Sequence, residues 1–555
     1  MTPSAGASGL RWGAPWGLAL LATVLLGWLW RLELLPLCAL LAAGMGLNLL
    51  ALGACKWPWE GARRPVQRLE LAQLERQVRR HPQRFWMGYG VHWNRTLAQT
   101  LHQRLSTSGD SASTLHLLDF SWRRQHLHLA AAPRLEHLLV VGAPGTGKTQ
   151  LFKLLALQAL LRREAVILLD PKGGEGLRPV LAQAARQFQR PYFQLLPAQP
   201  KASHALDLLA NGLEASELAS RLCFLLPQGE EDNVFGQFAW LTLQRIFQAL
   251  LLLQRPLSFA EVRQHVADQG RTLYTQLARC STSAPDLGTA LEGLRTLCAH
   301  ESGHYQKMIL ALTPVLQQLS TGVMATLLRS SQEPPEGDAP GAVFNLEQIT
   351  RQGGVFYAGL EALSDATRAR ALGALILSDL AALVGNRYRT GVTDAPPLRL
   401  FVDEASETCN PAFIQLLNKG REAGISVTFA VQTLADLEVA LGSAEAARMM
   451  IGNAGHFLAF RTLDAPSRQL WSERAGSGWI PLTQHSLGAQ ESRGWTGARR
   501  ALSAGRAQAL QQLPLIPEVM LAQLPDLHYV LLQADGSIQA GCLPLIRDPR
   551  QPERT

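Results

Sequence analysis

The feature that most constrains the fold of this chain is a glycine-rich octapeptide over residues 142–149, which reads Gly-Ala-Pro-Gly-Thr-Gly-Lys-Thr. It follows an apolar run and precedes a leucine-rich stretch of helical character, which is the strand–loop–helix context that the phosphate-binding pattern G-x-x-x-x-G-K-[ST] requires. In such a loop the backbone N–H groups and the start of the following helix surround the phosphates of a nucleotide. Lys148 can then reach the β- and γ-phosphates, and the Thr149 hydroxyl can bind Mg²⁺. The predicted nucleotide-binding residues of this loop are Gly142, Ala143, Pro144, Gly145, Thr146, Gly147, Lys148 and Thr149.

Two long apolar stretches precede this loop. Residues 13–30 and 34–55 contain no charged side chain, and three residues separate them. Each stretch is long enough to cross a hydrocarbon core of about 30 Å as a helix. We therefore expect a two-helix transmembrane hairpin within residues 1–59, with buried helices of a soluble domain as the alternative.

The charge that follows these stretches predicts their orientation. Residues 56–84 contain eight Lys or Arg against three Glu, and positively charged flanks stay in the cytoplasm. We expect a multi-pass membrane protein with both termini and the bulk of the chain in the cytoplasm.

Cysteine content and net charge exclude other classes. The seven cysteines are scattered and form no C-x-x-C pair, which argues against a disulfide framework and a cysteine zinc site and fits a reducing cytosol. A net charge of +8 over 555 residues is too modest to indicate nucleic-acid binding by itself.

Hydrophobic periodicity divides the remaining chain into an α/β core and a helical block. Short apolar runs such as 165–170 alternate with helical patterns, which predicts a buried parallel sheet. Between residues 205 and 340, apolar residues recur at helical spacing, which predicts an all-helical domain inserted in the α/β core. The remaining expected parts are a connecting segment (60–130), a nucleotide-binding domain (131–204 and 341–546) and a tail (547–555).

Four polar residues downstream are candidates for chemistry. The apolar run 398–402 ends in Asp403 and Glu404, which suit an Asp that holds Mg²⁺ and a Glu that polarises the attacking water. Gln432 follows the next apolar run and could position water or sense the γ-phosphate, with a solvated glutamine as the alternative. Arg421 is a candidate arginine finger for a neighbouring subunit, although a surface arginine is the favoured interpretation from spacing alone.

The segment 475–507 is rich in glycine, serine and arginine. A solvated loop is the favoured interpretation, and a DNA path lined by arginines is the alternative. The arginines concerned are Arg493, Arg499, Arg500 and Arg506.

In their order along the chain, these features resemble the conjugative coupling proteins of the TraD/TraG group, especially the subfamily found in integrating conjugative elements. The resemblance covers nearly the whole chain. It rests on the paired apolar spans, the phosphate-binding loop, a helical insertion, the motifs Asp170-Pro-Lys-Gly173 and Phe401-Val-Asp-Glu404, and the segments 353–360, 418–426, Gln432 and Asn453 to Arg461.

The resemblance implies a fold, an activity and partners. It implies a RecA-like motor domain with an inserted all-α domain, a homohexameric ring, and ATP hydrolysis with Mg²⁺ between subunits in the bacterial inner membrane. The implied partners are single-stranded DNA bound without sequence preference, a relaxase and the channel proteins of a type IV secretion apparatus.

The resemblance also assigns roles to residues. Lys148 and Thr149 would bind ATP and Mg²⁺, and Asp403 and Glu404 would hold the metal and activate water. Gln432 would couple hydrolysis to movement and Arg421 would be the finger. Asp170 and Lys172 would belong to the neighbourhood of the nucleotide.

Three other functions remain open from the sequence. They are an ATPase receptor that delivers protein effectors to a secretion channel, a chromosome-segregation pump of the FtsK kind, and a ring scaffold that binds nucleotide without hydrolysing it.

Overall fold

The computed structural model describes residues 68–107, 125–130, 136–174, 176–212, 214–226, 233–280, 286–332, 343–391, 395–494 and 497–546. The expected membrane spans 13–30 and 34–55 and the tail 547–555 lie outside this part of the chain. Within it, one helix, α16 (Ala366–Thr390), is long and apolar enough to cross a membrane, and 67% of its most apolar stretch is buried in the protein. That burial is typical of a core helix.

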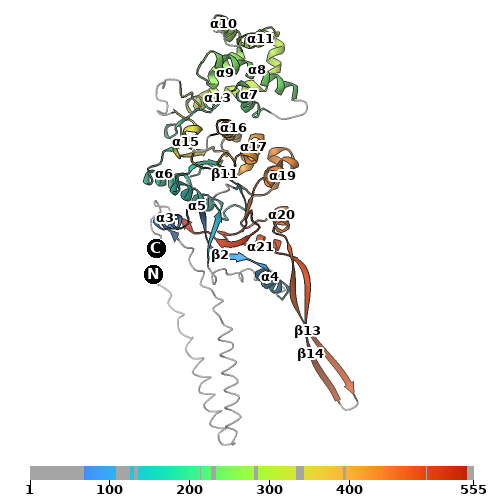
Figure 1. The fold of residues 1–555 in the computed structure, drawn as a ribbon. Helices are drawn as coiled ribbons and strands as arrows, with labels where there is room; N and C mark the ends of the chain where they lie inside the picture. Colours follow the sequence, from blue (N-terminus) through green and yellow to red (C-terminus); the bar gives the residue numbers. More distant parts are fainter. Residues whose placement is uncertain are drawn as a thin grey trace, which may run out of the picture. The chain divides into compact units, whose positions relative to one another are not determined.

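An eleven-stranded sheet forms the centre of the fold (Figure 1). Its run from β12 to β6 is parallel, and the strands beyond β12 join it antiparallel. In sheet order the strands are β3 (Gln125–Ala130), β2 (Arg84–Trp93), β16 (Ile538–Cys542), β15 (His528–Leu532), β12 (His456–Ala459), β4 (Leu138–Val141), β11 (Ile425–Val431), β10 (Leu398–Val402), β5 (Ala165–Asp170), β9 (Val355–Gly359) and β6 (Tyr192–Leu195).

Helices cover both faces of the sheet and bury its central strands. Every residue of β4, β5, β10 and β11 is buried, which is why these strands read as continuous apolar runs instead of alternating patterns. One core includes side chains of α3 (Leu71–Arg80), α5 (Lys148–Leu161) and α6 (Arg178–Gln187). The other core includes side chains of α15 (Leu346–Gln352), α16, α17 (Pro411–Lys419) and α19 (Ala444–Gly452).

A helical domain is inserted between β6 and β9. The chain enters this domain at β7 (Ala205–Leu206) and leaves it at β8 (Val343–Phe344), and these two short strands pair in parallel. The described helices of the inserted domain are α7 (Ala215–Cys223), α8 (Asn233–Leu252), α9 (Phe259–Ala267), α10 (Arg271–Ala278), α11 (Leu287–Cys298), α12 (Ser302–Met308), α13 (Leu312–Ser320) and α14 (Gly322–Leu327). The predicted mixed α/β core with a helical domain is therefore confirmed.

Two strands of the main sheet come from the expected connecting segment 60–130, because β2 pairs with β16 and β3 pairs with β2. Two glycines of β2 allow close packing of its backbone against β16. A Cβ atom at Gly88 would lie 2.2 Å from the Cys542 carbonyl oxygen, and one at Gly90 would lie 2.1 Å from that of Ala540. A glycine inside a strand often marks such a close approach.

The expectation of a solvated loop over 475–507 is wrong. Most of these residues belong to a two-stranded antiparallel ribbon, β13 (Ser477–Gly494) and β14 (Gly497–Pro514), drawn as two long arrows in Figure 1. Pairing between the two strands satisfies the backbone N–H and C=O groups that face the partner strand. The base of the ribbon packs on α4 (Arg95–Thr107), where the Gln103 side chain donates to the Thr483 carbonyl (2.6 Å) and accepts from the Thr483 N–H (2.8 Å).

Further elements follow β11, β12 and β14 or pair the first and last strands of the described part. They are α18 (Ala435–Leu441), α20 (Ala465–Ala475), α21 (Glu518–Gln523) and a parallel pair of β1 (Arg68–Leu69) with β17 (Leu545–Ile546).

Candidate nucleotide-binding site

The glycine-rich loop connects β4 to α5 and depends on two glycines with positive φ. Gly145 has φ +76° and Gly147 has φ +127°, a region that L side chains rarely adopt. A Cβ atom on Gly147 would also lie 3.2 Å from side-chain atoms of Leu527 and Phe460. The glycine spacing that defined the motif therefore has a backbone cause and a packing cause.

Backbone hydrogen bonds from other segments hold this loop in place. Ala143 N–H donates to the Arg461 carbonyl (2.8 Å), and Leu527 N–H donates to the Thr146 carbonyl (2.8 Å). The Thr146 hydroxyl donates to the Ala143 carbonyl (2.7 Å). Sequence reasoning missed the contacts with Arg461 and Leu527, because these residues lie more than 300 positions downstream.

Lys148 is the first residue of α5 and is largely buried. Its ammonium donates to the carbonyl oxygens of Gly142 (2.5 Å) and Ala143 (3.2 Å). Burial lowers the pKa of Lys148, while the carboxylates of Asp403 and Glu404 act in the opposite direction. Phosphate oxygens entering the loop would offer this ammonium stronger, charge-assisted partners than the two carbonyls.

Asp403 lies at the carboxyl end of β10, where open α/β sheets place ligands. Its side chain is buried, and one oxygen accepts the N–H of Glu404 (3.0 Å). Burial raises the pKa of Asp403 to about 6, and the nearby carboxylates of Asp170 and Glu404 add to this shift. A buried carboxylate among like charges is stabilised by a cation, so Asp403 suits Mg²⁺, with the exposed Thr149 hydroxyl as a second oxygen ligand.

Glu404 adopts a left-handed backbone conformation (φ 41°, ψ 59°). Such values are uncommon for a residue other than glycine and often occur at functional sites. Its Oε1 accepts hydrogen bonds from Gln432 Nε2 (2.9 Å) and from Lys172 Nζ (2.6 Å).

Strand order explains why these residues meet. The strand β11 lies between β4 and β10, so Gln432, just beyond β11, lies between Lys148 and the two carboxylates. The structure thus brings Lys148, Asp403, Glu404 and Gln432 to one edge of the sheet. Their catalytic roles remain predictions.

Arg421 lies at the opposite edge of the sheet. It precedes β11, and its guanidinium lies 2.6 Å from the carboxylate of Glu136, which precedes β4. The Arg421 side chain is 47% exposed. Arg421 therefore does not belong to the site of its own chain. Its predicted role as a finger requires a neighbouring subunit.

Asp170 shapes the turn that carries Lys172. One Asp170 oxygen accepts the N–H groups of Lys172 (3.0 Å) and Gly173 (3.2 Å), and the other accepts the Tyr357 hydroxyl (2.7 Å). The family resemblance implied that Asp170 and Lys172 lie near the nucleotide but did not predict the contact of Lys172 with Glu404.

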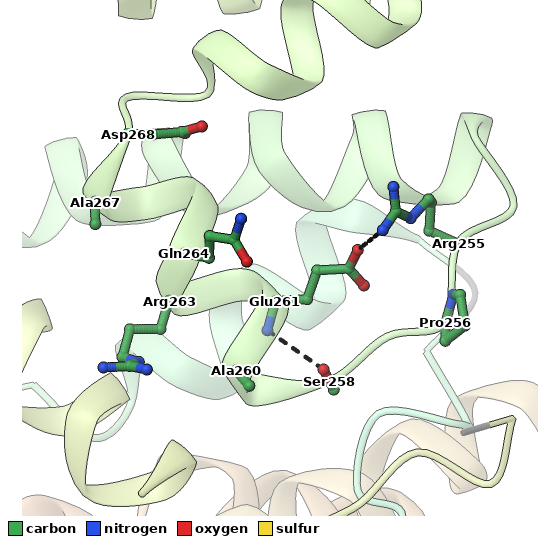
Figure 2. Close-up of a pocket in the computed structure, with 9 residues that line it drawn as sticks. All are labelled: Arg255, Pro256, Ser258, Ala260, Glu261, Arg263, Gln264, Ala267 and Asp268. Atoms are coloured by element: carbon green, nitrogen blue, oxygen red, sulfur yellow. Dashed lines mark hydrogen bonds and ion pairs between the residues drawn. The ribbon is translucent and has the colours of Figure 1, made fainter. Parts of the chain in front are cut away.

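An open cleft also occurs in the helical domain beside α9 (Figure 2). There Arg255 pairs with Glu261 (2.7 Å), and Ser258 caps the helix by accepting the Glu261 N–H (3.3 Å). Its lining lies within residues 255–268, so no residue of the nucleotide site contributes to it.

Comparison with known families identifies the carboxyl-terminal part of the motor. Residues 397–526, which include Asp403, Glu404, Arg421 and Gln432, match the family model TraG-D_C, described as the TraM recognition site of TraD and TraG. Over these residues the chain is similar to TraD and TraG. The predicted resemblance is thereby confirmed, while the narrower subfamily stays a prediction. No curated protein matches the chain.

Solved structures of coupling proteins show the same fold as this chain. The bacterial conjugative coupling protein TrwBdeltaN70, in its unbound monoclinic form, is 19% identical, with a TM-score of 0.56 over 84% of this chain and 96% of that chain. The plasmid coupling protein TrwB in complex with ADP and Mg²⁺ is 17% identical, with a TM-score of 0.50 over 84% of this chain and 96% of that chain. At these identities the likeness establishes the fold alone, a mixed α/β domain with a helical domain.

Proposed function

We propose that this chain is a membrane-anchored, ATP-driven DNA translocase that acts as a conjugative coupling protein. In this role it would recruit relaxase-bound DNA and deliver it to a type IV secretion channel. The observation that carries the proposal is the meeting of Lys148, Asp403, Glu404 and Gln432 at one edge of the sheet in a chain similar to TraD and TraG. A scaffold that only binds nucleotide needs neither a base nor a glutamine at that edge.

ATP and Mg²⁺ are the proposed cofactors. The solved TrwB complex with ADP and Mg²⁺ has the same fold, and the donor set suits a divalent cation because Asp403 is a buried carboxylate beside two others. When bound, Mg²⁺ would neutralise charge on the phosphate oxygens. Asp403 and Thr149 would hold it, and Lys148 would leave its loop carbonyls to bind the phosphates.

Water activation is assigned to Glu404, which would accept a proton from the attacking water. Gln432 donates to Glu404 and would orient the base or the water. Arg421 would complete the site of the next subunit, which agrees with its position at the other edge of the sheet. This arrangement supports a homohexameric ring whose sites lie between subunits.

The proposal also includes the membrane and the cargo. The apolar spans 13–30 and 34–55 would anchor the chain in the bacterial inner membrane with both termini in the cytoplasm. The description of the matched family, a TraM recognition site, supports a relaxosome partner. DNA would be bound through its backbone, without sequence preference.

The test is ATP hydrolysis by the full chain in detergent, with and without single- or double-stranded DNA. We expect DNA to stimulate hydrolysis severalfold. Lys148→Ala should lose activity, and Glu404→Gln should bind ATP but turn over about 10²–10⁴ times more slowly. A rate of ATP hydrolysis that no added DNA changes would favour a receptor for protein effectors. ATP binding and ring formation without hydrolysis would favour a scaffold.

A further inference from the structure

Two segments that are far apart in the sequence hold the phosphate-binding loop. Ala143 N–H donates to the carbonyl of Arg461, just beyond β12, and the N–H of Leu527, just before β15, donates to the carbonyl of Thr146. The Leu527 side chain also packs against the loop, because a Cβ atom on Gly147 would lie 3.2 Å from its Cδ2 atom. The shape of the loop therefore depends on Arg461 and Leu527 as well as on its own glycines.

The ladder between β12 and β15 ends before it reaches these two segments. Its last pair is Ala459 with Val530, and past this pair the chain runs through α20, the ribbon and α21 before it returns to β15. Two contacts of the Arg461 guanidinium bridge the gap. Its Nη2 lies 2.8 Å from Asp526 Oδ1, and its Nη1 donates to the carbonyl of Leu524 (3.3 Å), which is 63 positions away in the sequence.

Leu527 needs such support because its backbone conformation is strained. It has φ 67°, in a left-handed region that is uncommon for a residue other than glycine and persists where the surrounding structure imposes it. Its carbonyl accepts the Leu543 N–H (2.9 Å), and its side chain is buried. Asp526 directly precedes it, so the ion pair with Arg461 acts on the same segment that holds Thr146.

Strand order separates this support from the residues assigned to the chemical step. The strand β12 lies on one side of β4, whereas β11 and β10, which Gln432 and Glu404 follow, lie on the other side. The side chains of Arg461 and Asp526 are 34% and 64% exposed, so their pair contributes little to global stability. A change at this pair should therefore alter nucleotide binding and leave the chemical step unchanged.

We propose that Arg461 and Asp526 are positioning residues for nucleotide binding, whose ion pair holds the phosphate-binding loop in the shape that receives the phosphates. The inference rests on the proposed binding of ATP to this loop. A loop that already has its bound shape costs less free energy to order when the ligand arrives. Without the pair, only a fraction of the molecules present the loop in that shape, and the apparent Kd rises in proportion.

The test measures the Kd of ADP with Mg²⁺ for the full chain in detergent by calorimetry, together with kcat and KM for ATP. Arg461→Met should raise the Kd about fivefold and Asp526→Asn about threefold, as expected for one exposed pair, with kcat within twofold. The double variant should bind no more weakly than Arg461→Met, because both changes remove the same contact. Glu347→Gln, which removes the exposed partner of Arg351 on α15, is the matched control and should bind as wild type.

The direction of the Asp526→Asn effect distinguishes this inference from a direct contact of Arg461 with the nucleotide. Loss of a carboxylate near the loop should tighten the binding of an anion by charge alone, and an arginine that binds the nucleotide would be freed by the same change. Tighter or unchanged binding by Asp526→Asn, or effects that add in the double variant, would therefore overturn the inference. A wild-type chain that binds no ADP would instead reject the proposed function itself.

Discussion

Gln158 holds both backbone polar groups of Trp86. Its Oε1 accepts the Trp86 N–H (2.7 Å) and its Nε2 donates to the Trp86 carbonyl (2.9 Å), although the two residues are 72 positions apart. Gln158 is fully buried in α5, the helix that follows the phosphate-binding loop. These hydrogen bonds hold β2 against the helix that begins with Lys148. Residues before the phosphate-binding loop are therefore part of the same domain.

Gln158→Leu should therefore destabilise the protein by about 2–4 kcal/mol, because it leaves the buried N–H and C=O groups of Trp86 without hydrogen-bond partners. Thermal unfolding of the full chain would measure the change. The exposed Gln187→Leu on α6 is the matched control and should have little effect. Equal midpoints for both variants would show that Trp86 finds other partners.

Truncation tests the same relationship on a larger scale. A fragment that starts at residue 60 keeps β2, whereas one that starts at 131 removes it and exposes the apolar surface that Phe85, Trp86 and Met87 cover. We expect the first fragment to be soluble and to bind ATP, and the second to aggregate. Size-exclusion chromatography distinguishes the two outcomes, and a soluble, ATP-binding second fragment would contradict the expectation.

The sequence predicted the residues that meet at the nucleotide-site edge of the sheet, because the patterns that mark them are local. The glycine spacing of the phosphate-binding loop and the carboxylates of Asp403 and Glu404 each follow an apolar strand, and parallel strands bring their carboxyl ends together. The sequence did not predict β2, which lies between β3 and β16 in the sheet, because Gly88 and Gly90 serve a close backbone contact with β16 that only the distant partner strand explains. The pair of Lys172 with Glu404 depends on strand order across 232 positions, which no local pattern contains.

Asp403 should make the motor less stable at neutral pH when Mg²⁺ is absent. Its pKa is raised from 3.8 to about 6 in the folded protein. The folded state then binds the proton more tightly than the unfolded state, so this contribution to stability is full below pH 4 and is lost as pH rises through 6. At pH 8, Asp403→Asn should thus have a free energy of unfolding about 2–3 kcal/mol higher than wild type. It should therefore also unfold at a higher temperature.

The gain from Asp403→Asn should shrink towards pH 4. Stabilisation by Mg²⁺ with ADP should favour wild type instead, since the amide is a poorer ligand. Thermal unfolding across this pH range, with and without Mg²⁺ and ADP, would check both statements. A constant difference across pH would mean that Asp403 is not the titrating group.

Arg421 should act between subunits. Arg421→Ala should reduce DNA-stimulated kcat by about 10³ or more, with little effect on stability because its pair with Glu136 is half exposed. Glu136→Gln removes the same pair and keeps the arginine, so it is the matched control and should remain active.

Mixed rings locate the Arg421 defect. Subunits with Arg421→Ala and subunits with Lys148→Ala are each inactive alone, and mixing them should restore some turnover if each site takes its arginine from a neighbour. The absence of any restoration in mixed rings would contradict a finger that acts in trans.

The ribbon β13–β14 carries four arginines and one glutamate. Replacing Arg493, Arg499, Arg500 and Arg506 with Gln should weaken binding to single-stranded DNA and make it less dependent on salt, by up to about three units in the slope of log K against log salt. The exposed Arg351 and Arg448 are controls on the body of the protein. An unchanged slope would show that the ribbon does not contact DNA.

The most direct test of the central claim is movement along DNA. Full-length protein in detergent would be given ATP, Mg²⁺ and a single-stranded oligonucleotide blocked at one end by streptavidin on biotin, and release of streptavidin would be followed over time. The account predicts ATP-dependent release by wild type, and none by Lys148→Ala or Glu404→Gln. DNA-stimulated hydrolysis without release, from either end and on double-stranded DNA as well, would contradict a translocase.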